Sequence, residues 1–238
     1  MNDPNVLTAD VGVVGAGPGG MAAARSLAAA GLSVVVLDEG PAAGGQIFRQ
    51  LPPGATGAQL AEPPSHHHGH ALLGAFAASS RQHVRSAVVW DAKPGRLWFE
   101  HDGRSKLLRC QRIVLAPGAY DRCIPFPGWT LPGVVTAGAL QVMVRGFGIV
   151  PGKRALVVGS GPLLLPTVTA LVSAGVQVVA ACEASSRWRA LRALPGVFGN
   201  GARLREAWWY ARQLLRAGVR LRFGWTIVGC EGAGRVQR

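Results

Sequence analysis

The chain has 238 residues, of which 49% are hydrophobic and 16% charged, a composition that is typical of a globular α/β protein and excludes intrinsic disorder. Its formal net charge is +13, but the basic residues are scattered rather than gathered in one run, which does not favour nucleic acid as a partner. The excess reflects either the coding composition of the source genome or contact with an acidic partner protein.

A strand, a glycine-rich turn, a helix and a second strand open the chain. The strand at 11–14 leads into the turn, a helix over 21–30 follows, and the strand at 34–37 ends at Asp38. The turn consists of Gly15, Ala16, Gly17, Pro18, Gly19 and Gly20. Its first glycine permits a tight reversal, and its second lets bare backbone approach a pyrophosphate at the positive end of the helix. Asp38 can accept hydrogen bonds from ribose hydroxyls; the alternative is that the glycines only shorten a turn.

The region after Asp38 contains fewer motifs. Residues 39–65 are rich in Pro, Gly and Ala and predict an irregular excursion. Four histidines follow it, and we expect them to form a solvated loop rather than a metal site, because contiguous rings point in different directions and no acid or cysteine accompanies them. They are His66, His67, His68 and His70. A helix is predicted over 71–82 and a strand over 84–90.

An antiparallel meander is predicted next, with strands at 97–101 and 107–112 and a separate buried strand at 113–115. The Pro and Gly of 124–133 indicate a crossing between domains, and a helix is predicted over 134–147.

The strand–turn–helix device then recurs. A strand at 155–158 leads into Gly159, Gly161 and Pro162, a helix ends at Gly175, and a strand over 176–182 delivers Glu183. Two fingerprints with matched downstream acids indicate two dinucleotide sites. The second is weaker, because Leu164 stands where close helix packing normally requires a third glycine. A further helix and strand are predicted over 214–223.

Cysteine usage and hydropathy restrict the remaining possibilities. The four cysteines are far apart and form no Cys-x-x-Cys pair, so we expect no metal, iron–sulfur or dithiol site. Residues 155–182 contain no charge, but their Gly and Pro punctuation favours a buried βαβ unit over a membrane span. We see no signal peptide and expect a cytoplasmic location, with association to a membrane through a complex as the alternative.

Several of these segments together resemble the pyridine nucleotide-disulfide oxidoreductase superfamily. They are Gly15–Gly20, Asp38-Glu39, Gly44–Ile47, Leu115–Arg122 and Gly159–Pro166. Residues 116–122 and 159–166 resemble more closely the branch of flavoprotein α subunits of hydrogen cyanide synthase, opine oxidase, D-hydroxyproline dehydrogenase and heterotetrameric sarcosine oxidase.

The resemblance implies an α/β fold with two Rossmann-like dinucleotide-binding domains, the first carrying an inserted antiparallel β-meander. The first domain (1–137) would bind FAD, and the second (138–238) would hold NAD(P) or be a relic of that function. The residues implied for FAD are Gly15, Gly17, Pro18, Gly19, Gly20, Asp38, Glu39, Gly45, Gln46, Ala116 and Gly118. Those implied for NAD(P) are Gly159, Gly161, Pro162 and Glu183.

Relatives of this type return to their first domain through a Gly-Asp segment that contacts the flavin. This chain ends at Arg238, so we expect a C-terminally incomplete, N-terminal portion of a longer protein that holds FAD weakly or folds poorly alone.

The function implied is that of a FAD-dependent oxidoreductase. It would be the flavoprotein subunit of a complex that oxidises a small-molecule amine or amino acid at a C–N bond, and its partner would be a second flavoprotein subunit. No motif assigns a catalytic residue. One alternative is an NAD(P)H-dependent FAD reductase that uses Glu183, and another is an inactive fragment that acts as a binding module. A disulfide reductase is disfavoured because the redox Cys-x-x-Cys is missing.

Overall fold

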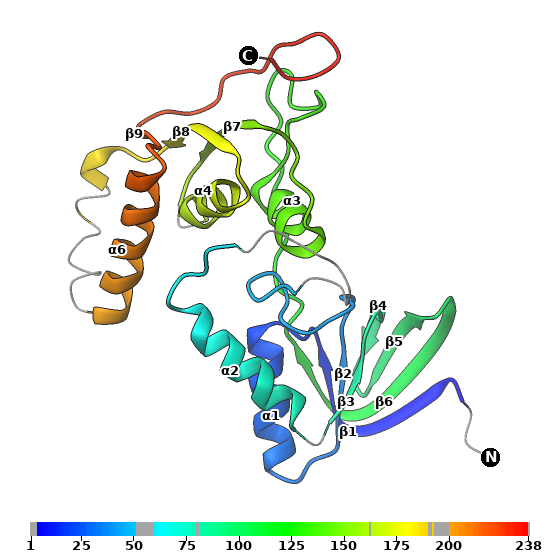
Figure 1. Cartoon of the computed structure of the whole chain (residues 1–238). Coiled ribbons are helices and arrows are strands. Elements are labelled where there is room, and N and C mark those ends of the chain that lie inside the picture. The colour runs from blue at the N-terminus through cyan, green and yellow to red at the C-terminus, as the bar shows by residue number, and fades with distance from the viewer. Residues whose placement is uncertain are drawn as a thin grey trace. The chain divides into compact units, whose positions relative to one another are not determined.

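The computed structural model describes residues 4–50, 60–79, 81–161, 163–189, 192 and 200–237. The chain forms two compact units (Figure 1). The first comprises Met1–Pro52 and His66–Ala119, and the second comprises Pro53–Ser65 and Tyr120–Arg238. These packing units differ from the domains at 1–137 and 138–238, because the side chain of Leu60 packs into the core of the second unit and the carboxylate of Asp121 accepts a hydrogen bond from the Gly138 N–H.

The first unit is built on a six-stranded sheet in the order β3-β2-β1-β6-β5-β4. Its strands are β1 (Val6–Val14), β2 (Val34–Leu37), β3 (Gln82–Val84), β4 (Val88–Lys93), β5 (Arg96–His101) and β6 (Arg104–Leu115). β1 pairs in parallel with both β2 and β6, and β2 pairs in parallel with β3. β4, β5 and β6 are antiparallel, which confirms the predicted meander beside a parallel sheet.

Each face of this sheet buries its own cluster of side chains. Successive residues of a strand point to opposite faces. Val34 and Val36 of β2 therefore face the helices α1 (Pro18–Ala29) and α2 (His66–Ala77), in a cluster with Met21 and Phe76. Val35 and Leu37 join the cluster formed with the meander residues Leu97, Phe99 and Leu108. The four-residue strand is buried throughout, since it lies between two apolar layers.

The histidine loop predicted at 66–70 is wrong. These residues form the first turns of α2, which spans His66–Ala77 rather than 71–82. The helix is stabilised by an inward stripe with helical spacing that consists of Gly69, Leu72, Leu73 and Phe76. Gly69 is buried against the ring of Phe48, where a Cβ atom would lie 2.2 Å from the ring. His67, His68 and His70 point into solvent.

Three further element predictions need correction. The strand predicted over 84–90 is two strands, β3 and β4, because the backbone turns at Ser86 with φ +51°. The strands predicted at 107–112 and 113–115 are one strand, β6, and its last residue Leu115 is exposed rather than buried. The helix predicted over 134–147 is shorter: α3 (Ala137–Gln141) follows the N-cap Thr136 and continues as the π-helix η1 (Val142–Gly146).

The second unit contains a three-stranded parallel sheet in the order β7-β8-β9. Its strands are β7 (Arg154–Gly159), β8 (Gln177–Glu183) and β9 (Leu221–Phe223), and its long helices are α4 (Leu164–Ser173) and α6 (Gly201–Arg216). The core consists of apolar side chains from α3, η1, α4, β8 and α6, such as Leu140, Val144, Val168, Val178 and Leu214. The helix and strand predicted over 214–223 are confirmed, with Gly218 at φ +63° between them.

The two units repeat one order of elements. β1-α1-β2-α2-β3 in the first corresponds to β7-α4-β8-α6-β9 in the second, and both strand triplets are parallel. The predicted Rossmann-like fold of both halves is therefore confirmed. None of the helices among the described residues combines the length and apolar character needed to cross a membrane.

Candidate dinucleotide-binding sites

The first glycine of the N-terminal turn is required by the fold. Gly15 has φ +95°, and its N–H donates to the carbonyl oxygen of Leu37 at 2.8 Å. A Cβ atom on Gly15 would lie 2.2 Å from the carbonyl oxygen of Ala116, which follows β6. The Ala116 N–H donates to the carbonyl oxygen of Val14 at 2.8 Å, so the predicted site residues Gly15 and Ala116 lie against each other.

The last glycine of this turn allows the helix to approach the strand end. A Cβ atom on Gly20, in the first turn of α1, would lie only 1.9 Å from the carbonyl oxygen of Gly15. Close packing of the helix normally requires a glycine at the last position of this motif, and the geometry at Gly20 shows such close packing.

The middle of the turn has no such restriction from the fold. Gly17 has φ −71°, which any residue adopts, and the nearest atom to a Cβ placed on it is 3.9 Å away. A Cβ on Gly19 would meet nothing within 4 Å. No steric clash within the chain therefore requires glycine at these two positions, whereas close approach of a ligand to the backbone would require it.

The N-terminus of α1 is suited to an anion. Its N-cap Gly17 provides no side-chain hydrogen bond, and no acidic residue lies in the first turn. The first N–H groups of a helix have no partner inside the helix, and together with the helix dipole they attract negative charge. Pro18 at the helix start gives up an N–H that needs no partner. The residues present thus fit the pyrophosphate of a dinucleotide.

A second glycine turn borders the first. The Gly44 N–H donates to the carbonyl oxygen of Ala16 at 2.9 Å, and Gly45 has φ +60°. A Cβ atom on Gly45 would lie 2.8 Å from the Cα of Gly17, so the predicted residues Gly17 and Gly45 are in close contact. The adjacent Gln46 is exposed, and its side-chain oxygen accepts a hydrogen bond from the guanidinium of Arg49 at 2.9 Å.

Asp38 has a structural role that the sequence did not reveal. It is 8% exposed, and its Oδ2 accepts a hydrogen bond from the N–H of Ala16 at 2.5 Å. Its Oδ1 accepts from the N–H of Gly40 at 2.8 Å. The carboxylate therefore holds the end of β2 against the glycine turn. Because each carboxylate oxygen can accept more than one hydrogen bond, contact with a ribose stays compatible with this role. Glu39 beside it is exposed.

Glu183 repeats this arrangement in the second unit. Its Oε2 accepts a hydrogen bond from the N–H of Gly161 at 3.1 Å, and its Oε1 accepts from the N–H of Ser185 at 2.9 Å. Burial raises the pKa of Glu183, but hydrogen bonds from Ser185, Gly161 and Ser160 outweigh burial and bring the pKa below its ordinary value. Glu183 is therefore a carboxylate at neutral pH.

The two turns nevertheless differ in shape. The residue with φ +95° is the first glycine, Gly15, in one turn and the second glycine, Gly161, in the other. α1 begins at Pro18, whereas α4 begins at Leu164, further along its motif. Leu164 is buried, and a Cβ on Gly159 would meet nothing within 4 Å, so the steric restriction found at Gly15 has no counterpart at Gly159. Pro162 lies outside the described residues.

Comparison with known proteins decides the family. The model described as pyridine nucleotide-disulphide oxidoreductase matches residues 9–237. The chain belongs to this family. An opine oxidase subunit of Agrobacterium tumefaciens (strain Ach5) is 37% identical over 198 residues, covering 78% of this chain and 39% of that protein. Hydrogen cyanide synthase subunit HcnB of Pseudomonas aeruginosa (strain PAO1) is 30% identical over 232 residues, covering 94% of this chain and 49% of that protein.

A solved structure has a similar fold. L-proline dehydrogenase from P. horikoshii aligns with a TM-score of 0.60 at 17% identity, over 99% of this chain and 39% of that one. The chain spans less than half the length of the two curated relatives. The family is one of FAD-dependent oxidoreductases.

The segment 116–122 of this family member divides between the two units. Gly118 has φ +77° and lies exposed in the first unit, with nothing within 4 Å of a Cβ placed on it. Asp121 belongs to the second unit, where its carboxylate accepts the N–H of Gly138 and so caps α3 together with Thr136. No sequence signal pointed to this cap, since α3 starts well beyond Asp121.

Proposed function

We propose that the first unit binds FAD and that the chain is the flavoprotein subunit of a complex that oxidises an amine or amino acid at a C–N bond and passes the electrons on. The observation that carries this proposal is the uncapped N-terminus of α1 beside Gly17, whose missing side chain the fold does not require. The relatives, which are named as subunits of opine oxidase and hydrogen cyanide synthase, support a role as one of several subunits.

Each part of the cofactor would have its own residues. Gly17, Gly19 and the free N–H groups of α1 bind the pyrophosphate, and the acids at the end of β2, Asp38 and Glu39, bind the ribose. Gly45 and Gln46 lie on the flavin side, and Ala116 and Gly118 line the pyrophosphate side. FAD, when bound, supplies the electron-accepting chemistry, and the protein positions it and tunes its potential. In this proposal the substrate is a small-molecule amine or amino acid, and the partner in the complex is a second flavoprotein subunit.

The second unit carries the alternative function, that of an NAD(P)H-dependent FAD reductase. Glu183 is held against the glycine turn as Asp38 is, which favours a second nucleotide site. A carboxylate at this position favours a ribose without a 2′-phosphate, and therefore NAD over NADP. Gly159, Gly161 and Pro162 would approach its pyrophosphate.

The reductant distinguishes the two candidate functions. Flavin absorbance of the purified protein is followed after anaerobic addition of NADH alone, and then of candidate amines with the partner protein present. Bleaching by an amine only when the partner is present supports the proposed function, and rapid bleaching by NADH alone supports the reductase. Partner binding by a chain that takes up no flavin contradicts both and identifies a binding module.

A further inference from the structure

The outer face of α6 lies outside the core that the described residues of the second unit form. The helix buries Tyr210 and Leu214, and Leu214 belongs to the core cluster. Trp208 and Leu215 lie on the other side of the helix and are 65% and 76% exposed. Two large apolar side chains that are exposed to water and lie outside the core indicate a candidate contact surface.

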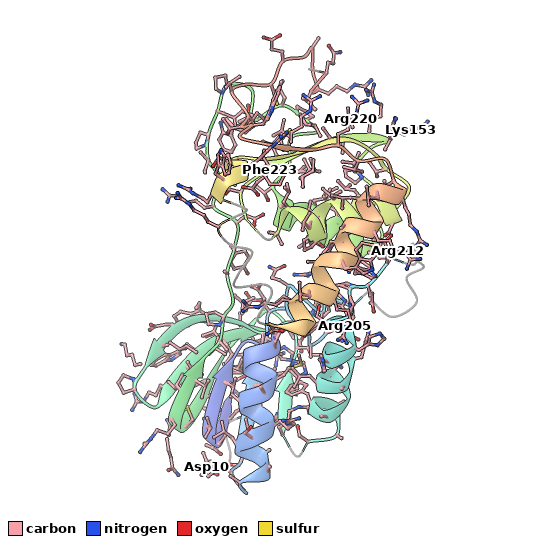
Figure 2. All side chains as sticks on the ribbon, turned by 90° about the vertical axis from the view of Figure 1, so that its left-hand side faces the viewer. Asp10, Lys153, Arg205, Arg212, Arg220 and Phe223 are labelled. Carbon is pink, nitrogen blue, oxygen red and sulfur yellow. The ribbon has the colours of Figure 1, made fainter. Side chains whose placement is uncertain are left out.

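Arginines accompany these apolar residues on the same face. Residues three, four or seven positions apart lie on one side of a helix, which places Arg205, Trp208, Arg212, Leu215 and Arg216 together. All five are exposed, and Figure 2 labels Arg205 and Arg212 along the helix. We call these five residues the α6 outer face.

The charge of this helix is not balanced by its own acids. α6 contains four arginines and a single acid, Glu206, which accepts a hydrogen bond from the Ser65 hydroxyl at 2.9 Å and is half-buried. The helix dipole accounts for Arg216 in the last turn, but it does not favour Arg205 near the start. Neither packing nor the dipole therefore explains why arginine stands at 205 and 212.

Further positive charge lies on the second unit. Lys153 and Arg220 precede β7 and β9, and both are exposed (Figure 2). Their carbonyl oxygens accept hydrogen bonds from Gln177 and Ala181 of the intervening strand β8, at 2.9 Å each. Both residues thus flank β8 through backbone hydrogen bonds, and Arg220 follows α6 within a few residues.

We propose that the α6 outer face docks on an anionic phospholipid surface, with Trp208 and Leu215 at the interface and the arginines against the headgroups. Tryptophan concentrates at membrane–water interfaces, and arginine keeps its charge in the headgroup layer while its stem covers apolar surface. The apolar centre of the face suits lipid better than the phosphates of nucleic acid. A net charge of +13 over the chain suits an extended anionic surface better than one acidic patch on a protein.

The test is cosedimentation of the full chain with vesicles of a three-to-one mixture of phosphatidylcholine and phosphatidylglycerol, and with phosphatidylcholine alone. We expect binding to the anionic vesicles only, weakening as salt is added. Arg205→Gln with Arg212→Gln should weaken binding about 25-fold, or about fivefold for each arginine removed. Trp208→Ala with Leu215→Ala should weaken it at unchanged charge.

The matched control is Arg104→Gln with Arg109→Gln, two exposed residues of β6 whose loss changes the net charge equally. This control should bind the anionic vesicles like the original chain, and circular dichroism should show all variants folded. Equal weakening by both arginine pairs, or no preference for anionic vesicles, would overturn the proposal. It would also be overturned if Arg205→Gln with Arg212→Gln weakened binding to duplex DNA, measured in parallel, but left vesicle binding unchanged. The test does not depend on whether the first unit holds FAD.

Discussion

Asp38 and Glu183 occupy equivalent positions in the two strand–turn–helix–strand motifs. Each carboxylate accepts a backbone hydrogen bond from a residue 22 positions earlier in the chain. Each also accepts a second hydrogen bond from the N–H two positions later, of Gly40 and Ser185 respectively. In each unit, the acid at the end of the second strand therefore connects that strand to the glycine turn by hydrogen bonds, without any ligand.

Replacing Asp38 by Asn should destabilise the protein. The amide nitrogen cannot accept a hydrogen bond, so one of the two backbone N–H groups loses its acceptor in a buried position, at a cost of about 1–3 kcal/mol. Urea denaturation measures the change in free energy of unfolding. Asp102→Asn is the control, because its side chain is 79% exposed, and it should change stability by less than about 0.5 kcal/mol. Equal effects of the two substitutions would show that the hydrogen bonds of Asp38 do not stabilise the fold.

The pH dependence of stability should reveal Glu183. Its pKa in the folded protein lies below the ordinary value of 4.5, so the unfolded chain binds the proton more readily. Its stabilising contribution is complete above pH 4.5 and is lost as the pH falls through the folded pKa. The difference in stability between the original chain and Glu183→Gln should therefore shrink as the pH is lowered below 4.5. A difference that grows on acidification would contradict the assigned direction.

Gly15 and Gly161 form a matched pair, since both have φ +95°. Gly15→Ala adds a clash with the Ala116 carbonyl to the backbone strain, whereas Gly161→Ala has open space. We expect Gly161→Ala to cost about 1–2 kcal/mol from strain alone and Gly15→Ala to cost distinctly more. Thermal and urea unfolding of both variants measure this. Equal losses would mean that the approach of Ala116 is not needed for stability.

Tyr210 should ionise at unusually high pH. Burial, assisted by the negative charge of Glu206, raises its pKa to about 12 despite the opposing effect of Arg145. The chain has two tyrosines, so Tyr120→Phe leaves Tyr210 as the only phenol. Ultraviolet difference absorbance of this variant should show a midpoint near 12 while the protein remains folded. A midpoint near 10, the ordinary tyrosine value, would show that Tyr210 is open to solvent.

Elements were predicted well where local pattern determines them. The run of branched residues at 34–37 indicated β2 to the residue, and the doubled fingerprint indicated both turns. The loop predicted at the histidines of α2 was wrong because Gly69 occupies an inward position of the helix without an apolar side chain, so the sequence does not show the full apolar stripe. The break at Ser86 was invisible, since a serine with positive φ has no sequence signature.

Contacts between distant residues account for the rest. Asp121 is 17 positions from the Gly138 N–H that it caps, and Ser65 is 141 positions from Glu206. No periodicity or motif relates such pairs, so neither the cap nor the place of residues 60–65 in the second unit could be predicted. Leu164 in place of the third glycine marked the second turn as different from the first, but it did not indicate that the second helix starts later in its motif.

An FAD site at the N-terminus of α1 is tested most directly by an FAD titration of Gly17→Ala against the original chain. The control is Gly74→Ala, an exposed glycine of α2 that also has open space for a Cβ. We expect the original chain and Gly74→Ala to bind FAD alike, while Gly17→Ala folds normally but binds at least about tenfold more weakly. Equal FAD binding by all three proteins, or none by the original chain, would contradict a site at this helix.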